Sequence, residues 1–137
     1  MQYATLREKI AAEKSARAAK YAGFAELYNR ARSAGRTAGE GARPAPMGIA
    51  DGITGELIEI VEGGPCGFAW VTIRPGGSSF ARWIVANGHG RKAYGGGIQL
   101  WIGDYGQSME RKYAHACAMA DTFRAAGIDA SAGARMD

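Results

Sequence analysis

The spacing of apolar residues predicts a long helical segment at the start of the chain. Two apolar stripes follow a helical period, the first at Tyr3, Leu6 and Ile10 and the second at Tyr21, Phe24, Leu27, Tyr28 and Ala31. Polar side chains separate the stripes for two turns, so the pattern fits either one long helix or two antiparallel helices that break near Gly23. Because neither form buries both stripes against its own body, we expect a homo-oligomer formed through the N-terminal helices.

Glycine and proline become frequent after residue 34 and predict a boundary there. The sequence therefore indicates three parts: a helical arm over residues 1–34, a Gly/Pro linker over 35–47, and a compact domain over 48–137.

The compact domain alternates between strand and helix periods. The pattern predicts a β-hairpin within 49–62, a central strand at 68–73, a helix at 80–87, a strand at 98–102, a helix at 109–126 and a strand at 128–134. Ser78 or Ser79 precedes the first helix and Ser108 the second, as N-cap residues do. The predicted fold is α+β, with a small mixed sheet (β-hairpin, β, α, β, α, β) that carries its helices on one face.

Length and composition exclude several classes of protein. The chain has 137 residues and a mass of 14.4 kDa, enough for one compact domain and one appendage. Its apolar runs fall far short of the ~20 residues of a membrane span, and its start lacks a signal-peptide core, so neither a membrane partner nor secretion is expected. Two cysteines do not form a disulfide framework and favour a cytoplasmic location.

The net charge of +4 is distributed unevenly. Residues 1–45 hold nine basic and four acidic side chains, whereas residues 46–137 hold eight basic and nine acidic ones. This asymmetry indicates an arm that faces a polyanion or an acidic partner. A solvated helix whose charges keep it soluble explains the pattern equally well.

The most suggestive segment for ligand binding is the glycine-rich loop at 89–97. Its glycines would let the backbone approach a ligand, and its cations would attract a phosphate or carboxylate. The loop matches neither the G-x-x-x-x-G-K-[ST] nor the G-x-G-x-x-G nucleotide-binding motif, and a plain strand connection would need similar glycines. The candidate ligand-binding residues here are Arg91, Lys92, Tyr94, Gly95 and Gly96.

The start of the second predicted helix is another candidate anion site. Unpaired backbone N–H groups at a helix start attract anions, and cations lie in this first turn. The alternative is that nearby carboxylates simply neutralise those cations. If both candidate sites exist, the loop and the helix start could flank one ligand, with the last strand nearby. The candidates here are Tyr105, Gln107, Ser108, Arg111 and Arg135.

Aromatic residues could also stack on nucleic-acid bases, as they do on the sheets of single-strand binders. Trp70 and Trp101 lie at strand positions, where an aromatic side chain is usually part of the core. Tyr94 and Tyr105 lie beside glycines in loops and are the better ligand candidates.

Catalysis is weakly supported by the sequence. Cys66 has no visible pairing with His89 or His115, and the acidic residues show no paired arrangement. His115 and Cys117 are two positions apart on a helix, so they point to different sides and do not form a metal pair. We expect no catalytic residues, no metal and no cofactor.

Several motifs resemble those of a group of small uncharacterised proteins of tailed phages and prophages. They are PCGFAWV at 65–71, FARW at 80–83, YGGG at 94–97, QSMERK at 107–112 and ARMD at 134–137. The resemblance implies a phage origin and a location in the cytoplasm of an infected bacterial host. It also implies the usual roles of small phage proteins, which are nucleic-acid handling, host takeover and neutralisation of a host defence.

The sequence thus favours a non-enzymatic binding protein for a phosphate-bearing ligand, with nucleic acid slightly preferred because the arm is basic. The alternative is a counter-defence protein that sequesters a small nucleotide signal or binds and inhibits a host protein.

Overall fold

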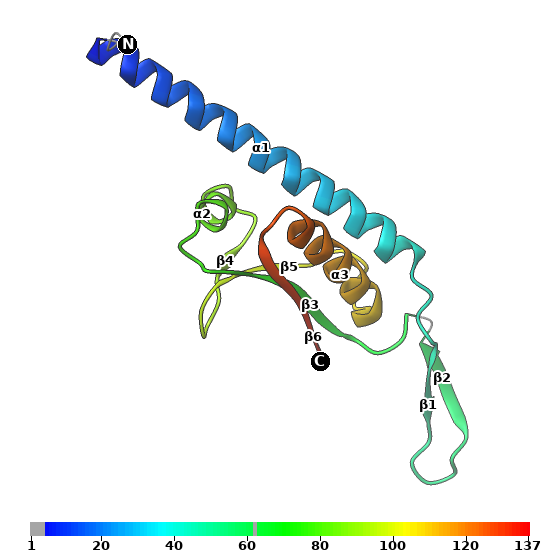
Figure 1. Cartoon of the computed structure of the whole chain (residues 1–137). Coiled ribbons are helices and arrows are strands. Elements are labelled where there is room, and N and C mark those ends of the chain that lie inside the picture. Colours follow the sequence, from blue (N-terminus) through cyan, green and yellow to red (C-terminus); the bar gives the residue numbers. More distant parts are fainter. Residues whose placement is uncertain (1–4, 62) are drawn as a thin grey trace.

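A computed structural model describes residues 5–61 and 63–137 (Figure 1). The N-terminal segment is one helix, α1 (Leu6–Gly41), which continues through Gly23 without a break. A capping box starts it, in which the Thr5 hydroxyl accepts from the Glu8 N–H and the Glu8 carboxylate accepts from the Thr5 N–H. Of the two arrangements that the sequence allows, the single long helix is therefore the one that forms.

The compact part contains a four-stranded sheet in the order β4-β5-β3-β6. Its strands are β3 (Gly67–Arg74), β4 (Arg91–Lys92), β5 (Ile98–Trp101) and β6 (Asp129–Met136). β3 is central and pairs along its full length with β6, so that Trp70 lies opposite Gly133 on one side and opposite Trp101 on the other. Every strand pair is antiparallel, whereas the sequence predicts a mixed sheet.

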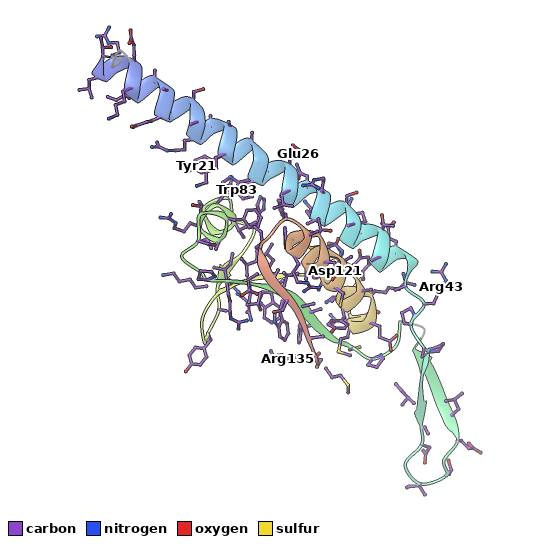
Figure 2. The ribbon with its side chains drawn as sticks, in the orientation of Figure 1. Tyr21, Glu26, Arg43, Trp83, Asp121 and Arg135 are labelled. Carbon is purple, nitrogen blue, oxygen red and sulfur yellow. The ribbon has the colours of Figure 1, made fainter. Side chains whose placement is uncertain are left out.

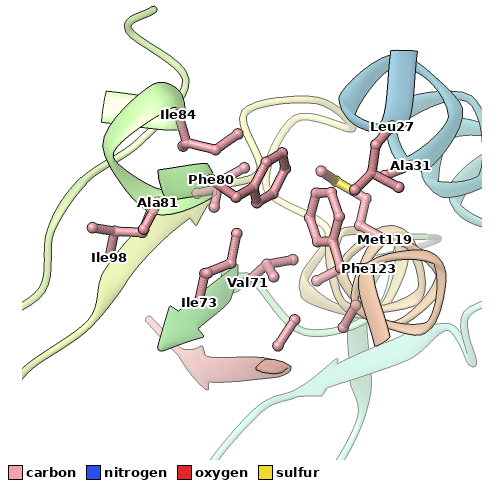
Figure 3. Close-up of a cluster of buried hydrophobic side chains, with 14 of the residues drawn as sticks. Leu27, Ala31, Val71, Ile73, Phe80, Ala81, Ile84, Ile98, Met119 and Phe123 are labelled. Atoms are coloured by element: carbon pink, nitrogen blue, oxygen red, sulfur yellow. The ribbon is translucent and has the colours of Figure 1, made fainter. Parts of the chain in front are cut away.

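Two helices cover one face of this sheet, which confirms the predicted α+β class. They are α2 (Ser79–Ala86), capped by Ser78, and α3 (Met109–Ala125), capped by Ser108. Residues 69, 71 and 73 of β3 point toward the helices and are fully buried, with Phe80, Ile84, Met119 and Phe123 packed on them (Figure 3). One core therefore joins the sheet to both helices.

The second half of α1 belongs to the same core. Leu27 and Ala31 are buried within it, and α1 packs closely along α3. Gly35 and Gly39 continue the Ala31 stripe toward the end of α1 and are also buried. A Cβ atom at Gly35 would lie 2.5 Å from the ring of His115, so the two helices approach this closely only because the residue is glycine.

Residues 35–41, which the sequence predicts as linker, are therefore helical. Their glycines serve helix packing rather than chain reversal. The connection between α1 and the next strand is limited to residues 42–46.

The predicted hairpin forms a separate sheet of two strands, β1 (Met47–Ala50) and β2 (Leu57–Val61). It projects beyond the C-terminal end of α1, away from the four-stranded sheet (Figure 1). The sequence pattern predicts this hairpin as part of the main sheet, which is wrong. Alternation of apolar and polar residues identifies a strand but does not show with which strand it pairs.

The first half of α1 extends past the rest of the molecule (Figure 1). Leu6 and Ile10, from the first apolar stripe, are 74% and 55% exposed, and Tyr3 lies outside the described residues. No helix in the described ranges is both long enough and apolar enough to cross a membrane.

Candidate nucleic-acid interface

The face of the sheet opposite the helices is open to solvent. Along β3, residues 69, 71 and 73 are buried and point toward the helices, and the residues between them point away from the core. The strand register places these outward side chains beside the outward side chains of the neighbouring strands. In the part of the chain that the structure describes, no helix packs on this side. We call it the open face. Its residues are Phe68, Trp70, Thr72, Arg74, Arg91, Gln99, Trp101, Asp129, Ser131, Gly133 and Arg135, of which Thr72 is itself buried.

Three aromatic rings form the centre of the open face. The ring centroids of Trp70 and Trp101 are 5.0 Å apart, and Phe68 meets Trp101 edge-on with centroids 6.0 Å apart. Trp101 is 36% exposed, and its indole N–H donates to Gln99 Oε1 at 3.2 Å. The rings therefore form one continuous aromatic surface that water reaches.

Gly133 makes room for this arrangement. A Cβ at this position would lie only 2.7 Å from Cε2 and Nε1 of the Trp70 indole. The ring therefore lies over the bare backbone of β6, and a larger residue at 133 would displace it.

Cations flank the aromatic centre on both sides. The Arg91 guanidinium lies 5.4 Å from the ring centroid of Trp101, and that of Arg135 lies 5.5 Å from the ring of Phe68. The ammonium of Lys112, a buried residue of α3, is 5.7 Å from the same Phe68 ring. The open face carries one acidic side chain, Asp129, which lies opposite Arg74 at the far end of β6. Arg74, Arg91 and Arg135 outnumber it, so the local charge is positive.

A shallow hollow of about 420 Å³ borders Trp101. Its lining residues are Gly88, His89, Gly90, Arg91, Gln99 and Trp101. The His89 ring stacks on Tyr28 with a centroid distance of 3.9 Å. Burial, and secondarily the charge of Arg32, lowers the pKa of His89, so this edge of the hollow is a neutral ring near pH 7.

The glycine-rich loop is a tight turn between β4 and β5. The Ala93 N–H donates to the Gly97 carbonyl and the Gly96 N–H to the Ala93 carbonyl. Gly95, Gly96 and Gly97 all have positive φ angles, so turn geometry accounts for these glycines. Lys92, in β4, and Tyr94, in the loop, are exposed, and neither lines the hollow beside Trp101.

The start of α3 is occupied by the chain itself. The Met109 N–H donates to the Pro65 carbonyl, and the Ser108 hydroxyl donates to the Gly63 carbonyl at 2.7 Å while accepting from the Arg111 N–H. Gln107 accepts from the Gly67 N–H. These bonds hold residues 63–67 against the helix and leave little of its N-terminus for an external anion.

Tyr105 is a packing residue rather than a free ligand group. Its hydroxyl is hydrogen-bonded to Nδ1 of buried His115 at 2.8 Å, and its ring faces Gly39 of α1. Burial, with help from Asp104 and Glu40, raises the pKa of the Tyr105 phenol.

The two predicted anion sites do not converge. The loop lies beside the end of β3 and the α3 start beside its beginning, so about 20 Å of strand separates them. Of the ten candidate residues, Arg91 and Arg135 lie on the same open face, where they occupy opposite ends of the aromatic surface. The sequence pattern allows Trp70 and Trp101 as stacking residues but favours Tyr94 and Tyr105. The reason is that apolar residues on both faces of a strand normally indicate a strand covered on both sides.

The described residues contain no group of three or more His, Cys, Asp or Glu side chains placed to hold a metal ion. Cys66 is exposed next to the start of β3, whereas His89 stacks on Tyr28 and His115 is bonded to Tyr105.

A comparison of the chain with protein-family models, curated proteins and solved structures found no match. The resemblance to small phage proteins thus stays a prediction, and function is argued from the open face.

Proposed function

We propose that this protein binds single-stranded nucleic acid on the open face, without catalysis. The observation that carries the proposal is the pairing of a solvent-accessible aromatic surface with arginines at both ends and no acidic side chain between them.

Stacking supplies the contact to the bases. Unpaired bases stack on exposed aromatic rings whatever their identity, and such contacts are worth about 1–3 kcal/mol per base. Trp101 is the best placed of the three rings, because it is the most accessible and borders the hollow. Bases inside a duplex are already stacked and cannot use this surface.

Electrostatics supplies the contact to the backbone. Arg91 and Arg135 lie on different edges of the sheet, on β4 and β6, so a strand that crosses the aromatic centre passes both guanidinium groups. Lys112 adds charge beneath Phe68. Gln99 and Ser131 offer hydrogen bonds but no arrangement that selects one base, so we expect little sequence preference.

The test is fluorescence anisotropy of labelled single-stranded DNA, single-stranded RNA and duplex DNA, titrated with protein at several salt concentrations. We expect single strands to bind more tightly than the duplex. The Trp101→Ala variant should bind about 5- to 150-fold more weakly, as loss of one stacked base implies. The Arg91→Ala/Arg135→Ala variant should lower the salt slope by about 1.4, since each contact to a single strand contributes about 0.7.

Two variants serve as controls. Tyr113→Ala removes an exposed aromatic ring from α3, on the opposite side of the sheet, and Arg30→Ala removes an exposed cation from α1. Both should bind as the wild type does. Equal affinity of the Trp101→Ala variant would refute the proposal.

The small-nucleotide alternative has a distinct signature. Because the hollow beside Trp101 is large enough for one nucleotide, a mononucleotide that binds as tightly as a long strand, with 1:1 stoichiometry and little salt dependence, would favour sequestration of a nucleotide signal.

A further inference from the structure

The hairpin β1–β2 has the character of a docking element. In the described part of the chain it pairs only with itself and has no extensive contact with another helix or strand. An isolated two-stranded hairpin is at best marginally stable in water, so a partner that covers it is expected. Its tip presents Ile53, which is 97% exposed, and Leu57 beside it is 59% exposed.

The hairpin is also acidic. Residues 47–61 contain Asp51, Glu56 and Glu59 and no basic residue. Asp51 accepts hydrogen bonds from the Ile53 and Thr54 N–H groups, and these bonds lower its pKa and keep it ionised. The exposed Ile53 is therefore flanked by the carboxylates of Asp51 and Glu56, a tip that does not suit a polyanion.

A groove with the opposite character lies between the projecting half of α1 and α2. It has a volume of about 800 Å³, and its lining includes three cations, Arg17, Lys20 and Arg82, and no acidic residue. Tyr21 and Trp83 provide its apolar walls (Figure 2). Tyr21 is 45% exposed, so the groove has an accessible apolar surface inside a basic rim.

We propose that the hairpin tip of one copy of this chain docks in the α1–α2 groove of another copy. Ile53 inserts between Tyr21 and Trp83, and the carboxylates of Asp51 and Glu56 pair with the cations of the groove. The acidic hairpin tip is complementary to the basic rim of the groove, and Ile53 is complementary to its apolar walls. Within the described residues, both surfaces are accessible.

The two surfaces differ from one another, which makes the contact heterologous. The hairpin follows the C-terminal end of α1 and the groove lies toward its N-terminal end (Figure 1). A chain that offers a hairpin at one end and a groove at the other associates head to tail. The inference does not depend on nucleic-acid binding, which uses the opposite face of the sheet from α2.

The experiment is sedimentation velocity of the full chain, free of nucleic acid, at low and high salt. We expect the wild type to exceed the monomer mass of 14.4 kDa at low salt and to dissociate as salt rises. Two variants should be monomeric: Ile53→Ser/Glu56→Gln in the hairpin and Arg17→Glu/Arg82→Glu in the groove. All four side chains lie outside the core, so circular dichroism should be unchanged.

Mixing the two monomeric variants is the decisive step. One variant keeps an intact groove and the other an intact hairpin, so the mixture should form a complex of two subunits and nothing larger. As a matched control, Arg7→Glu/Arg30→Glu makes the same charge change on α1 outside the groove and should assemble as the wild type does.

A monomeric wild type, a variant with the wild-type mass, or a mixture that stays monomeric would each overturn the proposal. If Arg17→Glu/Arg82→Glu instead weakens nucleic-acid binding at unchanged mass, the groove belongs to the nucleic acid.

Discussion

Replacing Gly35 by alanine tests whether α1 and α3 are in contact through bare backbone. In an ordinary helix this change is favourable, because alanine has the higher helix propensity by about 0.9 kcal/mol. Here the added Cβ would lie 2.5 Å from Cδ2 and 2.6 Å from Nε2 of His115, and 2.9 Å from Cγ of Met119. Carbon atoms normally approach no closer than about 3.5 Å, so the helices must separate by about 1 Å or the His115 ring must move.

Neither adjustment is easy. His115 and Met119 are buried, and the His115 ring is held by its hydrogen bond to Tyr105. Overpacking of this kind costs about 1–3 kcal/mol, and loss of the hydrogen bond adds about 0.5–1.5 kcal/mol. After the gain in helix propensity, we expect Gly35→Ala to lower the free energy of unfolding by about 2 kcal/mol and the melting temperature by about 8 °C.

Gly23 is the matched control within the same helix. It is exposed, and a Cβ there would meet nothing within 4 Å. Gly23→Ala should therefore raise the free energy of unfolding by up to about 1 kcal/mol.

Urea denaturation followed by circular dichroism measures both variants. Opposite signs for the two glycines would show that packing, and not helix propensity, decides at Gly35. If Gly35→Ala is as stable as Gly23→Ala, the close approach of α1 and α3 is not present in solution.

Three further predictions follow from the geometry. Burial lowers the pKa of His115, and Arg32 and Arg36 lower it further against the opposing effect of Asp104. The unfolded chain therefore binds a proton at a higher pH than the folded chain does, and stability falls as pH drops below about 6.5. The His115→Gln variant should flatten this part of a plot of melting temperature against pH, and an unchanged slope would contradict the assignment to His115. Gly133→Ala should displace the Trp70 indole, change the tryptophan emission and weaken binding of single strands, whereas unchanged emission would mean that the ring does not lie over β6. Removing residues 1–20 should leave the melting temperature within about 2 °C of the full chain, because residues 5–20 are exposed, while removing residues 1–34 should unfold the domain by deleting Leu27 and Ala31 from the core.

Local signals in the sequence predicted most elements correctly. Ser108 and Gly127 mark the ends of α3 to within a residue or two, and the apolar run at 68–73 identifies the central strand. These signals succeed because caps and strand patterns act over a few neighbouring residues.

The end of α1 could not be read in the same way. Gly35 and Gly39 have low helix propensity, so they indicate a linker when judged locally. They are helical because α3 packs on them, and nothing in their immediate neighbours reveals which element that is. The spacing of four residues between Ala31, Gly35 and Gly39 was the available signal, since such residues share one helix face.

The open face was missed for a related reason. In residues 68–73 both faces carry apolar or aromatic side chains, and the sequence does not say which face a helix covers. The difference lies in the pairing, which sets Trp70 beside Trp101 and Gly133 and brings Arg91 and Arg135 to the same side.

The glycine-lined contact between α1 and α3 also constrains the order in which the chain folds. More than half of the chain separates Gly35 from His115, so closing this contact requires a large loss of loop entropy. Until α3 arrives, Gly35 and Gly39 each disfavour helix by about 1 kcal/mol relative to alanine, and the last turns of α1 fray. During synthesis the first half of α1 therefore becomes helical early, whereas its last turns become ordered only when α3 docks on them, which makes this contact a late step of folding.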